Sequence, residues 1–295
     1  MAKSKTRLVN VDFYEVEGWC PGATISRECL AEVLRHLWNR QNGEPCQTEV
    51  GGELIRLRFL QDQGDLLFGD VAKLRFNEPV RLAHVSGREW PATKDRDEGP
   101  SESAAFLYAP SRRVLAYQRN KSGPSCEDFR ICVMNLSATG EIYRFLPIIR
   151  RSLVEDLLNR KPRALKCRVA LPKLATEAPG ALGAVISAAD ILHAPELRIE
   201  FGFGRRAGKL DAGKVVEFVR QALMLGNQGA RLDKLEATAG SDEGHKSQVL
   251  KFLDAVLTSP QTIPRTNLPH EDDKHRQSAV LAAFNAVKPD LRVYA

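Results

Sequence analysis

The amino-acid sequence predicts an α+β protein of two domains, in which mixed sheets carry flanking helices. The first observation is periodicity. Some stretches alternate polar and apolar residues, as strands do, and others repeat apolar residues every three or four positions, as helices do. The second is the length of 295 residues, which is enough for two ordinary domains. The third is the composition, because 43% hydrophobic and 27% charged residues are typical of a globular protein with a buried core.

The first ninety residues predict a small α/β arrangement. Residues 7–17 alternate polar and apolar side chains and are expected to form a strand. Ser26 can cap the first turn of a helix whose apolar residues share one face, and Asn42-Gly43 end that helix. Residues 53–60 alternate again, and residues 65–76 form a further strand with an irregularity at Gly69-Asp70.

The next segment lacks the side chains needed for a core. Residues 91–102 contain no large apolar residue, so we expect a mobile loop or linker there. Strands at 104–108 and 114–118 follow. Pro124 then opens a helix with acidic residues in its first turn, where they face the positive end of the helix dipole. That helix is expected to end near residues 138–140.

The remaining pattern predicts an inserted second domain. After a strand at 141–149, helices and strands are expected at 152–159 (helix), 163–171 (strand), 181–192 (helix), 196–203 (strand), 209–225 (helix), 231–237 (strand) and 248–257 (strand). Three prolines between residues 260 and 269 indicate an extended connector, and a helix at 271–287 closes the chain. We therefore expect an N-terminal α/β domain of residues 1–159 plus 266–295. A basic, swivel-like α+β domain of residues 160–265 is inserted into it.

Positive charge is concentrated in the middle of the chain. Residues 110–173 contain fourteen Lys or Arg against five Asp or Glu, whereas the whole chain carries a net charge of +6. A local cation excess of this kind indicates a surface that binds a polyanion. The cations lie at strand ends and turns, which suits contacts with the DNA backbone and carries little sequence information. The expected DNA-binding residues are Arg112, Arg113, Arg119, Lys121, Arg150, Arg151, Arg160, Lys161, Arg163, Lys166, Arg205, Arg206 and Lys209.

A glycine-rich turn adds to this set. Residues 202–209 follow an expected strand and precede an expected helix, and they contain three glycines beside Arg205, Arg206 and Lys209. The segment matches neither a P-loop nor a dinucleotide fingerprint. Its backbone N–H groups can bind one phosphate, or it can be an ordinary turn with solvated basic residues.

The sequence lacks the residues that several other classes of site require. The six cysteines form no close pair, and His270 and His275 miss the spacing of four that a helical zinc site needs. We therefore expect no metal site, no cofactor and no catalytic residue. No apolar run reaches the roughly 18 residues of a membrane span. Because an expected strand follows the basic N-terminus directly, where a signal peptide would have an apolar segment, we expect a cytoplasmic protein.

Residues 103–262 also carry a family pattern. It consists of Phe106-Leu107, the strand from Leu115 to Arg119, the Ser-Gly-Pro-Ser turn from Ser122 to Ser125, a Leu-Pro-Ile-Ile-Arg strand, and the acidic pair Glu155-Asp156. In this order the chain resembles the RexA phage-exclusion sensor family and, more loosely, the DNA-binding KwaB component of two-gene antiphage systems. The resemblance implies a cytoplasmic DNA-binding protein with a small membrane-protein partner.

Together these observations predict a non-catalytic protein that binds double-stranded DNA largely without sequence preference, as a sensor or effector of antiphage defence. We expect the duplex to be held in a clamp, either between the domains or across a homodimer. Two alternatives stay open. The first is a metal-dependent nuclease, for which Asp190, Glu196 and Arg198 are the candidate residues. The second is an interaction scaffold whose basic patch binds an acidic protein.

Overall fold

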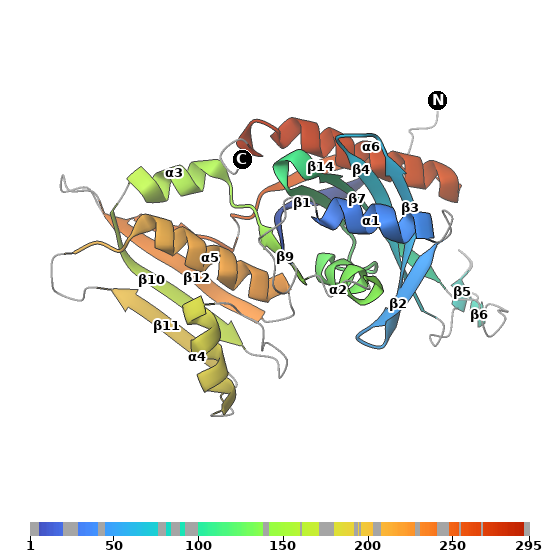
Figure 1. Ribbon diagram of the computed structural model, residues 1–295. Coiled ribbons are helices and arrows are strands. Elements are labelled where there is room, and N and C mark those ends of the chain that lie inside the picture. The colour runs from blue at the N-terminus through green and yellow to red at the C-terminus, as the bar shows by residue number, and fades with distance from the viewer. Residues whose placement is uncertain are drawn as a thin grey trace. The chain divides into compact units, whose positions relative to one another are not determined.

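The computed structural model describes most of the chain and divides it into two units (Figure 1). The described residues are 6–19, 29–40, 45–75, 81–83, 89–91, 100–137, 142–159, 161–170, 180–191, 194, 196–202, 208–227, 231–240, 248–253, 255–266 and 268–291. Helices and strands alternate irregularly along them, and every strand pair with a defined register is antiparallel. The predicted α+β class is therefore confirmed.

The first unit comprises residues 1–11, 16–144 and 259–286, and the second comprises residues 12–15, 145–258 and 287–295. The sequence had placed the inserted domain at 160–265. In the structure the second unit begins earlier. The reason is that Val154 and Leu157 of the helix α3 (Arg151–Asn159) belong to the same buried cluster as Leu165 of the following strand.

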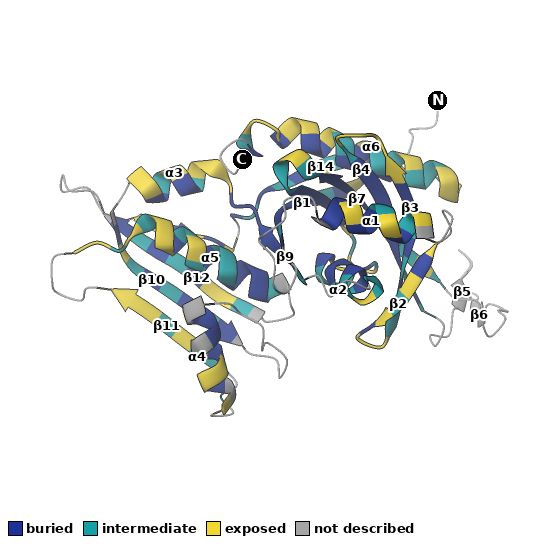
Figure 2. Ribbon diagram, in the orientation of Figure 1, coloured by how far each residue is buried: buried dark blue, intermediate teal, exposed yellow. Residues whose placement is uncertain are grey.

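A large sheet organises the first unit. Its strands lie in the order β14 (Thr258–Pro264), β1 (Thr6–Trp19), β8 (Val114–Arg119), β7 (Ser101–Ala109), β4 (Leu67–Leu74), β3 (Glu53–Asp62) and β2 (Cys46–Val50), and β9 (Ile142–Pro147) also pairs with β1. A separate short ribbon pairs β5 (Arg81–Ala83) with β6 (Glu89–Pro91). The helices α1 (Cys29–Arg40), α2 (Cys126–Leu136) and α6 (Pro269–Val287) complete the unit. Figure 2 shows that the central strands β4 and β7 are buried along most of their length.

The helix α2 begins where its sequence predicts. The Ser125 hydroxyl accepts a hydrogen bond from the backbone N–H of Asp128 at 3.0 Å, and the Asp128 carboxylate accepts one from the N–H of Ser125 at 2.8 Å. This capping box satisfies two N–H groups that the first turn would otherwise leave unpaired. Phe129 then packs its ring against Phe106 of β7, with ring centroids 4.6 Å apart. The expected end of this helix, near residues 138–140, lies outside the described residues.

Gly69 of β4 leaves room for the buried ring of Phe106. A Cβ atom at position 69 would lie 2.1 Å from the ring atom Cζ of Phe106, which is a hard steric overlap. We expect Gly69→Ala to lower the free energy of unfolding by about 1–3 kcal/mol, as overpacked cores do. In a Phe106→Leu background, which lacks that ring, the same substitution should cost clearly less. Urea unfolding of the four proteins measures this difference, and an equal cost in both backgrounds would contradict it.

The proline-rich connector differs from the prediction. Residues 258–264 form the strand β14 at the end of the large sheet, although they contain Pro260 and Pro264. Proline is tolerated there because an edge strand has one side without a hydrogen-bonding neighbour. Ile263 packs with Val9 of β1 and Ala279 of α6, which anchors the returning chain. The strand β2 was also missed, and the expected strand at 248–257 ends at Lys251.

The second unit is a four-stranded antiparallel sheet with helices on one face. The strands lie in the order β11 (Glu196–Gly202), β10 (Lys161–Ala170), β12 (Arg231–Gly240) and β13 (Gln248–Lys251). Leu165, Cys167 and Val169 of β10 are buried in a cluster that also contains residues of α3, α4 (Gly180–Ile191) and α5 (Ala212–Asn227). Lys166 and Arg168 alternate with them and stay partly exposed on the opposite face.

Residues 92–99 of the expected loop, and the expected helix start at Ser26, lie outside the described residues. The last two residues of that expected loop, Ser101 and Glu102, already belong to β7.

Candidate functional site

The predicted DNA-binding residues fall into five places. The first place is the turn between β7 and β8, which contains Arg112 and Arg113. Pro110, Ser111 and Arg112 form a single 3-10 turn, and the N–H of Arg113 donates to the carbonyl of Pro110 at 3.1 Å. Arg113 adopts a left-handed backbone with φ of 54°, which redirects the chain into β8. Its carbonyl accepts a hydrogen bond from the N–H of Val16 at 2.7 Å, so the turn is tied to β1.

A second group gathers at one end of the small sheet, which we call the basic end. It comprises Lys161 and Arg163 at the start of β10, and Lys209 just before α5. The N–H of Leu210 donates to the carbonyl of Pro162 at 2.7 Å, so these two distant segments lie side by side. Antiparallel pairing of Ala164 with Gly202 brings the end of β11 to the same place. The structure therefore brings together residues that lie 38 positions apart (Ala164 and Gly202) and 48 positions apart (Pro162 and Leu210) in the sequence.

Two cations of the basic end are available to a ligand. Arg163 and Lys209 are exposed, and neither has an ion-pair partner among the described residues. The nearest acid in the sequence, Asp211, has its own role. Its carboxylate accepts a hydrogen bond from the N–H of Lys214 at 3.0 Å and so caps α5. Arg160, Arg205 and Arg206 lie outside the described residues, next to these positions in the chain.

Lys166 lies on the open face of the small sheet, where charges are paired. Its ammonium group is 2.9 Å from the carboxylate of Glu200. Arg168 donates to Glu196 at 2.6 Å, and Arg198 donates to the same carboxylate. These two hydrogen bonds lower the pKa of Glu196 below its usual value. Because each described cation of this group has an acidic neighbour, the face offers less free positive charge than the basic end.

The remaining pair of the second unit is Arg150, just before α3, and Arg151, the first residue of α3. Arg151 donates to Glu155 one turn later at 2.6 Å, and both side chains are exposed, so this pair contributes little to stability. The side chain of Arg150 is exposed, and its backbone N–H donates to the carbonyl of Ala255 at 2.8 Å.

Arg119 and Lys121 line a polar cavity of about 530 Å³ in the first unit. The cavity walls are formed by Arg7, Leu8, Val9, Asn10, Arg58, Ser101, Glu102, Ser103, Gln118, Arg119, Asn120, Lys121, Pro269, Asp272, Asp273 and Arg276. Most of these groups are already engaged. Arg7 binds Asp272 through two hydrogen bonds of 2.6 and 2.7 Å, and Arg58 binds Asp273 at 2.9 Å. The cavity can admit a small polar group, but Arg7, Arg58 and Arg276 in its walls are neutralised by the carboxylates of Asp272 and Asp273.

Behind this cavity lies a buried charge network. Asp70 of β4 is 2% exposed and lies 2.7 Å from the guanidinium of Arg276 on α6, which is 4% exposed. Burial raises the pKa of Asp70, although Arg276 and Arg58 act in the opposite direction. Burial also opposes the charge of Arg276, but its three neighbouring carboxylates, those of Asp70, Asp273 and Asp272, raise its pKa above the usual value. The network fastens α6 to the large sheet.

Sequence reasoning missed this network because its members lie far apart in the chain. The positions of Arg7 and Asp272 differ by 265. One signal was present, since Asp70 interrupts an otherwise apolar run from Leu66 to Ala72, and a buried carboxylate requires a cationic partner. Nothing in the sequence identified Arg276 as that partner.

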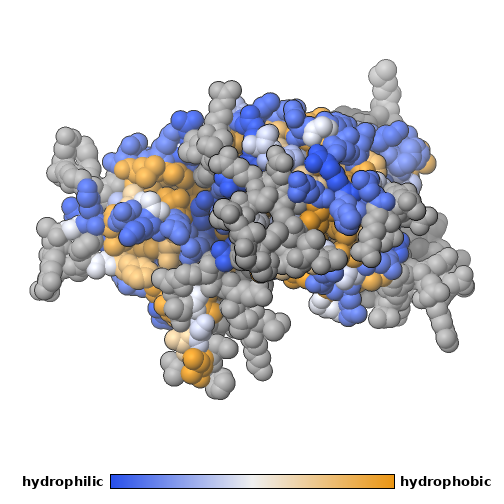
Figure 3. Space-filling model, in the orientation of Figure 1, coloured by the Kyte–Doolittle hydropathy of each residue, from blue (hydrophilic) through white to orange (hydrophobic). Residues whose placement is uncertain are grey.

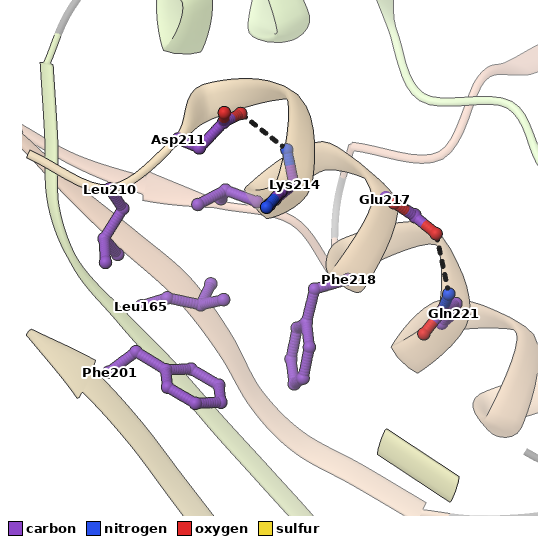
Figure 4. Close-up of a pocket in the computed structure, with 9 residues that line it drawn as sticks. Leu165, Phe201, Leu210, Asp211, Lys214, Glu217, Phe218 and Gln221 are labelled. Atoms are coloured by element: carbon purple, nitrogen blue, oxygen red, sulfur yellow. Dashed lines mark hydrogen bonds between the residues drawn. The ribbon is translucent and has the colours of Figure 1, made fainter. Parts of the chain in front are cut away.

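An apolar groove of about 440 Å³ lies beside α5 in the second unit. Figure 4 shows the side chains of Phe201 and Phe218 directed into the same space, with Leu165 and Leu210 on its other sides. The two rings meet edge to face with centroids 5.5 Å apart. Figure 3 shows apolar side chains exposed over the same part of the second unit. Charged groups also line the groove, namely Asp211 just before α5 and Lys214 and Glu217 of α5.

The nuclease candidates are not assembled into a carboxylate cluster. Glu196 is occupied by Arg168 and Arg198, and the side chain of Asp190 lies outside the described part of the structure. Within the described residues, no three His, Cys, Asp or Glu side chains lie close enough to hold one metal ion. Cys46, Cys126, Cys132 and Cys167 are buried free thiols, and burial raises the pKa of Cys132 and Cys167 to about 12. Such thiols are poor nucleophiles.

Comparisons with known proteins give no match, either with family models or with curated proteins. Among the described residues, no helix is both long enough and apolar enough to cross a membrane.

Proposed function

We propose that the protein binds double-stranded DNA through its phosphate backbone, with the basic end of the second unit as the principal contact. One observation carries this proposal. The hydrogen bond between Leu210 and Pro162 joins two basic segments that are remote in the sequence, and it presents Arg163 and Lys209 at the same end of the sheet. Exposed cations without a carboxylate partner can exchange their counterions for phosphates, which is the main source of sequence-independent affinity for DNA.

The geometry favours backbone contacts over base reading. Base recognition in the major groove usually requires a helix that presents several side chains along one face. Here Arg163 belongs to a strand and Lys209 to the segment before a helix. Contacts of this kind fix the position of a protein on a duplex without selecting its sequence. We therefore propose a largely sequence-independent DNA-binding protein that needs neither metal nor cofactor for binding.

Salt dependence tests the proposed function. We expect the affinity for a plain duplex to fall by about 10³ to 10⁵-fold between roughly 50 and 200 mM salt if six to ten phosphates are neutralised. Fluorescence anisotropy with labelled duplexes of two unrelated sequences measures both the slope and the sequence preference. An affinity that does not change with salt, or no binding at low salt, would contradict the proposal. Binding to an acidic protein instead would favour a scaffold.

We further propose that DNA binding serves antiphage defence, together with a small membrane protein. This part rests only on the resemblance of residues 103–262 to the RexA family. It is tested by plaque formation on cells that carry the gene with its neighbours. Protection should disappear when Arg163 and Lys209 are both replaced by glutamate. Protection that persists in cells producing this double variant would separate the defence role from DNA binding.

A further inference from the structure

The strand β11 is one of the two outer strands of the small sheet, as far as the sheet is described. It pairs with β10 on one side, and no described strand pairs with its other side. An outer strand presents unpaired N–H and C=O groups, which can bind a strand of another chain. The charged and apolar residues of β11 indicate what kind of strand can pair with this edge.

Two opposite charges flank the centre of β11. Arg198 and Glu200 lie on either side of Ile199 and point to the open face of the sheet. Their side chains are 73% and 63% exposed. On the other face, Leu197 and Phe201 each lie two positions from Ile199 in the sequence. The strand therefore has apolar residues placed symmetrically about its centre, and charges of opposite sign placed symmetrically on the other face.

We infer that a second copy of the chain adds its own β11 to this edge in antiparallel direction, with the two-fold axis at Ile199. In this register Ile199 faces its own copy. Arg198 faces Glu200 of the partner subunit, and by symmetry Glu200 faces the partner's Arg198. Opposite charges in directly facing positions stabilise an antiparallel pair. Glu196 faces the partner's Gly202, where no side chain stands in its way.

The charges exclude the neighbouring symmetric registers. An axis perpendicular to the sheet must map each face onto itself, so some residue of β11 has to face its own copy. With Arg198 at the axis, two arginines face each other, and Glu196 faces Glu200 of the partner subunit. With Glu200 at the axis, two glutamates face each other. Like charges in facing positions are destabilising, so of these three registers the one at Ile199 is favoured on both faces.

The apolar groove also favours a second copy of the chain as the partner of β11. Phe201 is 42% exposed at this edge, which is unusual for a ring that already packs against Phe218. In the proposed dimer the partner's Leu197 faces Phe201 on the helix-covered side of the sheet and shields it from water. Leucine against an aromatic ring is a favourable facing pair.

The inference does not depend on DNA binding, and its test contains no DNA. Sedimentation or light scattering of the wild-type chain should give twice the chain mass of 32.8 kDa. Arg198→Glu places two Glu–Glu pairs across the axis, and Glu200→Arg places two Arg–Arg pairs there. We expect each variant to raise the dimer dissociation constant about tenfold or more. An equimolar mixture of the two variants restores both opposite-charge pairs and should recover the dimer.

The mixture distinguishes the proposed interface from a loss of folding. A wild type that stays monomeric, single variants that dimerise as the wild type does, or a mixture that stays monomeric would each overturn the inference. A monomeric wild type that takes up a β-strand peptide of another protein would assign the edge to that partner instead.

The register has its own test. Facing residues of an antiparallel pair have Cα atoms about 4.5–5.5 Å apart, which is within reach of a disulfide. Ile199→Cys should therefore form a disulfide-linked dimer under mild oxidation. Phe201→Cys should not, because its opposite residue is the partner's Leu197. Linking of Phe201→Cys as readily as Ile199→Cys, with the wild type as background, would overturn the register.

Discussion

Arg276→Ala should lower the free energy of unfolding by about 3–5 kcal/mol, which is typical when one member of a buried ion pair is removed. Arg276 is 4% exposed and lies 2.7 Å from Asp70 and 3.2 Å from Asp272. Among the described residues, the substitution leaves the buried carboxylate of Asp70 with Arg58 as its ion-pair partner, at 3.6 Å. Urea unfolding of the full chain measures the loss. Lys274→Ala is the matched control, because Lys274 is exposed on the same helix.

The same variant should show a characteristic pH dependence. Burial already raises the pKa of Asp70, and removing Arg276 raises it further. A carboxyl whose pKa is higher in the folded than in the unfolded chain binds more protons when folded. Its contribution to stability therefore falls as the pH rises from the pKa of the unfolded chain to that of the folded chain. The deficit of Arg276→Ala should therefore shrink when unfolding is measured at about pH 5 instead of about pH 7.5.

Two outcomes would contradict this account. A loss no larger than that of Lys274→Ala would mean that the network does not hold α6 to the large sheet. A deficit that is independent of pH would mean that Asp70 stays ionised without Arg276.

The fold was largely predictable because its signals are local. The strands β1 and β3 follow from alternation, and the start of α2 follows from Pro124 and the acidic residues of its first turn. The strand β14 was not predicted because prolines such as Pro260 and Pro264 are typical of an extended connector. Only the position of that strand at the edge of a sheet makes its prolines acceptable, and this position depends on residues far away in the sequence.

The candidate site was predictable only in part, for the same reason. The cations of the basic end are visible as a local charge excess, but a composition cannot show which of them are neutralised. Lys166 is paired with Glu200, whereas Arg163 has no ion-pair partner among the described residues, although both lie on β10. The pairing depends on the register of β10 with β11, in which Lys166 faces Glu200. Sequence alone does not specify that register.

This distinction leads to a test of the proposed contact. We expect Arg163→Glu combined with Lys209→Glu to weaken duplex binding about a thousandfold at low salt. A cation about 4 Å from a phosphate contributes roughly 1 kcal/mol in water, and reversing its charge turns that attraction into a repulsion of similar size. Two reversals therefore cost about 4 kcal/mol, which corresponds to a factor of about one thousand in the dissociation constant.

The matched control changes the net charge by the same amount elsewhere. Lys274 and Lys288 are exposed, and neither has an ion-pair partner in the described part of the chain. Lys274→Glu combined with Lys288→Glu should weaken binding less than tenfold, because neither lysine belongs to the basic end. Fluorescence anisotropy gives the affinities, and circular dichroism checks that both variants are folded. Equal losses in the two double variants would show that net charge alone governs binding. Wild-type affinity in the Arg163 and Lys209 variant would show that DNA does not contact the basic end.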